Sequence, residues 1–149
     1  EVVKQMNKHN ILVDVSHLSD AGFKDLCSLT DYPFIASHSN CRSITNNPRN
    51  LTDDQIKEFI AREGLIGLNF YDAFVGKDKN DLKKHIDHFL ELGAEKVLCM
   101  GSDFDGADII YDIANFDGFY GLYDDMINWY GENITENIFY NNAKRFIKI

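Results

Sequence analysis

Short apolar runs that alternate with helical patterns constrain the fold of this 149-residue chain more than any other feature. Four runs rich in β-branched and apolar residues lie at residues 11–15, 34–36, 65–70 and 97–100. A longer stretch with apolar residues at helical spacing follows each run. This alternation is typical of parallel βα units, whose strands are buried on both faces.

The helical stretches carry their own start and stop signals. Thr52 and Gln55 have the spacing of a capping box, in which the two side chains satisfy free backbone amides at a helix start, so we expect a helix over residues 52–62. A helix over residues 81–92 ends at Gly93, since glycine favours the left-handed conformation found after a helix. The other expected helices cover residues 1–8, 19–29, about 120–129 and 135–147.

About four βα units without a Pro- or Gly-rich linker indicate a single unit over residues 1–149. Two α/β architectures fit: half of a (β/α)8 barrel, or a small open doubly wound sheet. A whole barrel needs roughly 200 residues or more, so the barrel interpretation makes this chain part of a longer protein. No GxGxxG or GxxxxGK(S/T) pattern follows a strand, which disfavours a nucleotide-binding open sheet.

Charge and cysteine usage exclude several classes of partner. The formal net charge of −9 argues against nucleic acid, because phosphate binding needs clustered Lys and Arg. No apolar run approaches the roughly 18 residues that cross a bilayer, so we expect no membrane contact from this segment. The three cysteines lie far apart and lack a CxxC spacing, which disfavours a disulfide framework or a cysteine zinc site.

Polar and titratable side chains follow the apolar runs at the same end of each expected strand. His17, His38, Asn69 and Asp103 are among them. The carboxyl ends of parallel strands are where α/β barrels build their active sites. We therefore expect His17, His38 and Asp103 to face a common space.

His17 and His38 lie 21 residues apart, close to one βα repeat, so they belong to neighbouring strands. Two neighbouring imidazoles at a barrel mouth can share a metal ion, or bind one each of a close pair. A strand-end histidine can equally be a hydrogen-bonded polar residue that binds nothing. The spacing leaves both interpretations open.

Asp103 and Asp105 stand in an Asp-x-Asp-Gly turn after the last strand. They could supply an acid/base group or a metal ligand, or they could bond their own backbone, as aspartates in such turns often do. Ser37 beside His38 raises the question of a serine nucleophile. No GxSxG pattern is present, which disfavours serine hydrolase chemistry.

His85 and His88 are three residues apart on an expected helix. This spacing could chelate a metal ion, but no carboxylate or cysteine cluster is obvious beside them. We expect a solvated helix surface here.

Four motifs, in this order and separation, resemble the renal (membrane) dipeptidase family. They are Val13-Asp14-Val15-Ser16-His17-Leu18-Ser19, Ile35-Ala36-Ser37-His38-Ser39-Asn40, Arg49-Asn50-Leu51-Thr52-Asp53-Asp54 and Gly101-Ser102-Asp103-Phe104-Asp105-Gly106. The resemblance runs from about residue 11 to about residue 106, with a weaker echo at residues 141–146. It implies the C-terminal half of a (β/α)8 TIM barrel with added C-terminal helices, from an enzyme that hydrolyses dipeptides with zinc.

In that family, two zinc ions are bridged by a glutamate and a water or hydroxide. The resemblance implies that His17 and His38 bind one zinc ion, and that Arg49 binds the dipeptide carboxylate through its bidentate fork. It further implies that Asp103 takes a proton from the attacking water and passes it to the leaving amine. Phe74 stands where some relatives place a tyrosine beside the substrate, which leaves the side-chain preference open.

The family's other metal ligands, a His-x-Asp pair and the bridging glutamate, precede the region that this chain matches. We therefore expect the N-terminal half of the barrel to be missing and the chain alone to be inactive. Its strand edges should make it associate, as a homo-oligomer or with the other half as a separate piece. Two alternatives stay open: a metal-free, inactive relative or binding module, and a related barrel hydrolase that acts on another amide.

Overall fold

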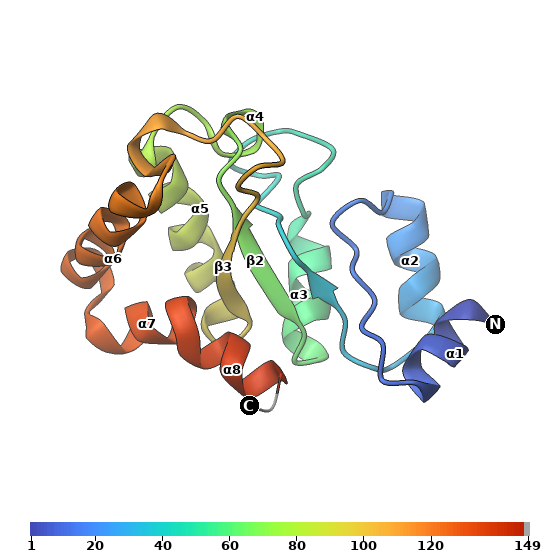
Figure 1. Cartoon of the computed structure of the whole chain (residues 1–149). Helices are drawn as coiled ribbons and strands as arrows, with labels where there is room; N and C mark the ends of the chain where they lie inside the picture. The colour runs from blue at the N-terminus through green and yellow to red at the C-terminus, as the bar shows by residue number, and fades with distance from the viewer. Residues whose placement is uncertain (148–149) are drawn as a thin grey trace.

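Three parallel strands form the central sheet of the chain (Figure 1). The computed structural model describes residues 1–147. β1 (Ile35–Ala36), β2 (Leu65–Asn69) and β3 (Leu98–Ser102) lie side by side in that order. At least one helix separates each strand from the next along the chain, which confirms the predicted α/β class.

Helices lie along the sheet and beyond both of its edges. Figure 1 shows α3 and α5 beside the strands, α1 and α2 on the β1 side, and α6, α7 and α8 on the β3 side. The helices are α1 (Val2–Lys8), α2 (Asp20–Leu29), α3 (Asp53–Ala61), α4 (Asp72–Val75), α5 (Lys79–Glu91), α6 (Phe116–Tyr130), α7 (Glu132–Glu136) and α8 (Asn142–Ile147), with 3-10 turns at Ala94–Lys96 and Tyr111–Ile113. Within residues 1–147, every helix is too short or too polar to traverse a bilayer.

The predicted start of α3 and end of α5 are confirmed. Gln55 N–H donates to Thr52 Oγ1 (3.3 Å) and Thr52 N–H donates to Gln55 Oε1 (2.9 Å), which completes the capping box. Gly93 has a φ of +84°, in the left-handed region that favours glycine. Both signals are local, because each depends on residues that are close in sequence.

The helix predicted over residues 135–147 forms, but it begins earlier, at Glu132, and contains a π-helical turn. A π-helical turn (Asn137–Asn141) separates α7 from α8. Directly after this turn, Asn142 is buried, and its amide donates to the carbonyl oxygens of Glu95 (2.7 Å) and Leu98 (2.8 Å). The wider turn therefore accompanies the docking of this segment onto the start of β3.

The strand predicted at residues 11–15 does not form as a regular strand. Only Asp14 bridges to Ile35 in the parallel sense. The residues on either side of β1 keep this pairing from extending. Pro33, before β1, has no N–H to donate, and the Ser37 N–H, after β1, donates to the Asp14 carboxylate (3.1 Å).

Aromatic and aliphatic side chains fill the core between the sheet and its helices. The Phe34 ring packs edge-on against Phe59 and Phe23, with ring centroids 4.9 Å and 5.4 Å apart. Ile66 and Leu68 of the central strand have no exposed surface. This burial is expected of a parallel strand covered on both faces. Because the strands are parallel, their carboxyl ends lie at one edge of the sheet.

A β-bulge shapes that edge. Leu68 pairs with Met100, but Asn69 pairs with Ser102, so β3 carries one extra residue. Ser102 and Asp103 have positive φ values of 54° and 70°, which non-glycine residues seldom adopt. Bulges re-aim side chains and are frequent beside functional sites. The chain thus turns sharply at the point where Asp103 leaves the strand.

Candidate active site

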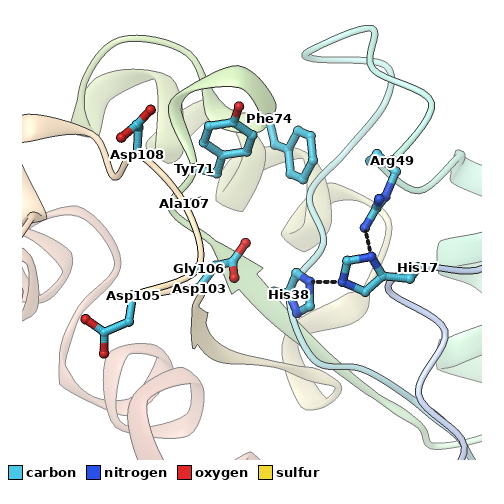
Figure 2. Close-up of a pocket in the computed structure, with 10 residues that line it drawn as sticks. All are labelled: His17, His38, Arg49, Tyr71, Phe74, Asp103, Asp105, Gly106, Ala107 and Asp108. Carbon is cyan, nitrogen blue, oxygen red and sulfur yellow. Dashed lines mark hydrogen bonds between the residues drawn. The ribbon is translucent and has the colours of Figure 1, made fainter.

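A cavity of about 530 Å³ lies at the carboxyl ends of the strands (Figure 2). His17, His38, Arg49 and Asp103, which were the candidates from the sequence, all line it. The other lining residues come from the segment after β2 and the loop after β3, and they are Tyr71, Phe74, Asp105, Gly106, Ala107 and Asp108. The cavity falls within the roughly 300–1,000 Å³ typical of small-molecule sites.

The two histidines face each other across a short gap. Their Nε2 atoms lie 3.0 Å apart and their ring centroids 5.0 Å apart. Two imidazole nitrogens on one tetrahedral zinc ion, each about 2.0–2.1 Å from the metal, would lie roughly 3.3 Å apart. Because Arg49 donates to His17 Nδ1, the proton of the neutral His17 ring lies on Nε2 and points to His38 Nε2, so both nitrogens bind one ion only if the rings move slightly and this proton leaves.

A chain of hydrogen bonds orients the His38 ring. The Ser37 hydroxyl donates to Asp14 Oδ2 (2.5 Å), which leaves Ser37 Oγ to accept from His38 Nδ1 (2.8 Å). With the proton on Nδ1, His38 Nε2 keeps the lone pair that a metal ion requires. Burial alone would raise the pKa of Asp14, but hydrogen bonds from Ser37 and Ser16 outweigh it and hold this pKa below its usual value.

Ser37 therefore orients the ring of its neighbour His38. Its hydroxyl proton points to Asp14, and Ser37 is not among the residues that line the cavity. Ser16 forms a second link, because its Oγ accepts from the backbone N–H of His38 (3.0 Å). Together these contacts join the end of β1 to the segment that carries His17.

Arg49 reaches the cavity from the loop before α3. Its Nη2 donates to Ser16 O (3.1 Å) and to His17 Nδ1, and its Cζ lies 5.9 Å from the centroid of the Phe74 ring. Its Nε is buried and has no hydrogen-bond partner among the residues described. Leaving a buried N–H unpaired costs about 1–3 kcal/mol.

Asp103 lies across the cavity from Arg49 (Figure 2). Its Oδ2 accepts a hydrogen bond from Asn69 Nδ2 (3.1 Å). Asp105, the other candidate carboxylate of this turn, is exposed and points away from the histidines. Of the two, Asp103 is the carboxylate placed among the other candidate residues.

The cavity brings together two side chains of a type that commonly binds zinc. Strong zinc sites have three or four protein ligands, whereas His17 and His38 bring two imidazole nitrogens together. In the described part of the chain, no group of three or more His, Cys, Asp or Glu side chains could hold a metal ion. The residues present fit zinc as two of its ligands, and further ligands would have to be added to complete the site.

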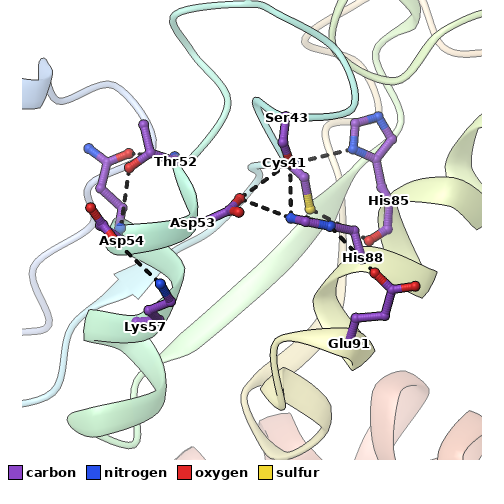
Figure 3. Close-up of polar contacts among 10 residues, drawn as sticks. Cys41, Ser43, Thr52, Asp53, Asp54, Lys57, His85, His88 and Glu91 are labelled. Atoms are coloured by element: carbon purple, nitrogen blue, oxygen red, sulfur yellow. Dashed lines mark hydrogen bonds and ion pairs between the residues drawn. The ribbon is translucent and has the colours of Figure 1, made fainter.

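The prediction that His85 and His88 form a solvated helix surface is wrong (Figure 3). His85 has no exposed surface: its Nδ1 accepts the Cys41 N–H (3.1 Å) and its Nε2 donates to Val75 O (3.0 Å). His88 Nε2 lies 2.9 Å from Asp53 Oδ1, with which it forms an ion pair when protonated. The loop before α3 and the start of α3 pack on this face of α5, a contact that the periodicity of α5 alone does not reveal.

Two buried amides beside the cavity were not predicted as site residues. Asn40 and Asn69 both have no exposed surface. An uncharged amide carries no metal-ligand or acid/base signature, so the only signal in the sequence was the position of Asn69 at the end of an apolar run.

Comparison with known proteins gives a consistent result. The model of the membrane dipeptidase family, peptidase family M19, matches residues 1–149. A dipeptidase of Clonostachys rogersoniana is 35% identical over 108 residues, which cover 70% of this chain and 28% of that protein. An uncharacterised Klebsiella pneumoniae protein is 29% identical over 157 residues, which cover 99% of this chain and 58% of that protein.

Solved structures have the same fold. A metallopeptidase from Rhodobacter sphaeroides, solved with a phosphinate mimic of the dipeptide L-Ala-D-Ala, matches with a TM-score of 0.94 and 33% identity over 99% of this chain and 44% of its own. An amidohydrolase from Pseudomonas aeruginosa matches in fold, with a TM-score of 0.86 and 16% identity over 99% of this chain and 55% of its own. The chain thus spans about half the length of these two solved structures.

Proposed function

Because the chain belongs to the membrane dipeptidase family, peptidase family M19, we propose that the protein containing it hydrolyses dipeptides. The observation that supports this is the meeting of His17, His38, Arg49 and Asp103 around one cavity. Metal-assisted hydrolysis needs metal ligands, an acid/base group and a substrate-binding group within reach of the same molecule. A cavity of about 530 Å³ is large enough for a dipeptide.

We propose that the chain forms the C-terminal half of a (β/α)8 barrel. The parallel strand order and the helices around the sheet agree with this architecture. Ile11 and Leu12, which precede the single bridge at Asp14, are 54% and 47% exposed, as side chains would be where a neighbouring wall of the barrel is absent. The other half of the barrel is the partner that we propose for this edge.

Zinc is the metal that we propose, with His17 and His38 as two of its ligands. Imidazole nitrogen suits zinc, and the hydrogen bond from His38 Nδ1 to Ser37 leaves the lone pair of His38 Nε2, which now faces His17 Nε2, for the metal ion. When bound, zinc lowers the pKa of a coordinated water toward neutrality and polarises the peptide carbonyl. The remaining ligands and the second ion would belong to the other half of the barrel, so we expect the chain alone to be inactive.

Arg49 would bind the carboxylate of the dipeptide. A guanidinium binds a carboxylate with two parallel hydrogen bonds, and Arg49 lines the cavity. The Phe74 ring beside the guanidinium restricts its movement. Recognition of a free carboxylate next to the scissile bond would select dipeptides over longer peptides.

Asp103 would transfer the proton. Its Oδ2 accepts the Asn69 amide, which leaves Oδ1 to take a proton from the attacking water and to return it to the leaving amine. The segment of Asp103 turns toward the cavity because of the bulge in β3.

The test is Asp103→Asn in the full-length protein, assayed on a panel of dipeptides with zinc content measured in parallel. We expect turnover to fall by about 100-fold or more with zinc retained, because the variant removes proton transfer and not a ligand. Asp105→Asn is the matched variant, and a larger loss there would reassign the role. Undiminished turnover in Asp103→Asn would refute the proton shuttle, and an intact protein that binds no zinc would favour a metal-free binding module.

A further inference from the structure

Asn40 and Asn69 form a buried amide pair between the ends of β1 and β2. Asn40 Nδ2 donates to Asn69 O (2.9 Å), and Asn40 Oδ1 accepts from Asn69 N–H (3.1 Å). One side-chain amide thus satisfies both backbone groups of Asn69, as a neighbouring strand would. Asn40 follows His38 by two residues, so this pair joins the histidine-bearing loop to the end of β2.

The orientation of the Asn69 side chain is determined by its partners. Its Oδ1 accepts the Tyr71 N–H (2.5 Å), and its Nδ2 donates to Asp103 Oδ2 (3.1 Å). The reversed amide would set its NH2 group against the Tyr71 N–H and its oxygen against a carboxylate. Both contacts would then be repulsive, so the group that Asn69 directs to Asp103 is always a hydrogen-bond donor.

Asp103 needs such a partner because its own backbone is irregular. It follows the β3 bulge with a φ of 70°, outside the regular strand geometry that would otherwise fix its side chain. Asn69 stands opposite Ser102 across that bulge, one residue from Asp103. The bulge therefore brings a rigid, fully buried amide against a carboxylate on a turn.

We propose that Asn69 is a positioning residue for the reaction: it holds one oxygen of Asp103 and so fixes where the other oxygen points. Asn40 in turn aligns Asn69 with the loop of His38. This inference rests on the proposed function, in which Asp103 transfers the proton. Asn69 touches Asp103 and not the substrate cavity, so it acts on the proton-transfer step rather than on substrate binding.

The experiment is a double-mutant cycle in the full-length, zinc-loaded protein, with Asn69→Ala, Asp103→Asn and the double variant. We expect Asn69→Ala to lower kcat by about 10- to 100-fold, the size of effect for losing a hydrogen bond to a charged group. KM and zinc content should stay near their original values. In the Asp103→Asn background, Asn69→Ala should cause no further loss of kcat, because its target has already been removed.

Asn142→Ala is the matched control. Asn142 is an equally buried amide that donates to two backbone carbonyls, but it lies at the opposite end of β3. We expect this variant to lower the melting temperature and to leave kcat unchanged. A loss of kcat equal to that of Asn69→Ala would mean that general destabilisation explains both, and would overturn the inference.

Asn69→Asp keeps the inference testable if the alanine variant does not fold. It preserves the shape and the acceptor for Tyr71, but an ionised carboxylate cannot donate to Asp103. Its kcat relative to the original protein should be low at neutral pH and recover as the pH falls, since the protonated form donates again. If the losses of kcat in the double-mutant cycle are additive, or if Asn69→Asp keeps full kcat, the role of Asn69 is refuted but the proposed function is not. An unimpaired Asp103→Asn would remove the proposed function on which it rests.

Discussion

Acidification should weaken the fold through His85. The ring is fully buried and accepts the Cys41 N–H at Nδ1, so the native contacts require the neutral imidazole. Burial lowers the pKa of His85 to about 4, compared with about 6.5 in an unfolded chain. Between these values the unfolded state binds more protons, so stability rises with pH. The stabilisation is complete above about pH 6.5 and is lost as the pH falls through about 4.

The size of the effect follows from the difference between the two pKa values. A difference of about 2.5 pH units corresponds to about 3 kcal/mol of unfolding free energy, at about 1.4 kcal/mol per unit. In a domain of this size, 1 kcal/mol shifts the melting temperature by about 2–4 °C. His85 alone should therefore account for a fall of about 6–12 °C between neutral pH and about pH 4.

The assay is urea unfolding across this pH range for the original protein and for His85→Gln. The variant should be less stable at neutral pH, because a flexible side chain replaces the planar ring that joins the Cys41 N–H to the Val75 carbonyl. Its stability should then depend less on pH, by about 3 kcal/mol over the window. His9→Gln, which replaces an exposed histidine at the end of α1, is the control and should keep the original slope. Equal slopes for the original protein and His85→Gln would refute the reasoning.

Three further outcomes are expected. Arg49→Ala in the full-length protein should raise KM about 10-fold or more for dipeptides with a free carboxylate, but not for amidated analogues; equal effects on both would contradict carboxylate recognition. Equilibrium dialysis should find only weak zinc binding to the chain alone, abolished in His38→Ala, and a tight stoichiometric site would contradict the two-ligand interpretation. Sedimentation at micromolar concentration should show that the chain associates, because Ile11 and Leu12 are exposed at one edge. A lone 17.1 kDa monomer with cooperative unfolding would instead refute the half-barrel proposal.

The features that were predicted correctly depend on local chemistry. The capping box at Thr52, the glycine after α5 and the polar residues at strand ends each need only a few neighbours in sequence. The parallel arrangement then brings His38 and Asp103 to one edge, because the carboxyl ends of β1 and β3 coincide, and the bridge between Asp14 and Ile35 places His17 beside them.

The features that were missed depend on partners far along the chain. His85 is buried by a loop more than 30 residues before it, and the periodicity of its own helix contains no trace of that contact. Asn69 acquires its role from Asn40 and Asp103, which lie on the two neighbouring segments of the sheet edge. A pattern along one element predicts which face is apolar, but it does not predict which polar group meets that face.

Gly67 and Gly101 show what a residue type alone can predict and what it cannot. A glycine inside a strand weakens it, unless another part of the backbone must approach closely. Here a Cβ on either residue would lie 2.1 Å from the Ser37 carbonyl oxygen, so neither position tolerates a side chain unless Ser37 moves. Ser37 sets the orientation of His38. The absence of a side chain at Gly67 and Gly101 therefore helps to determine where the His38 ring lies in the cavity. Residue type alone could indicate that something approaches these strands, but only the folded chain identifies it as the segment that carries His38.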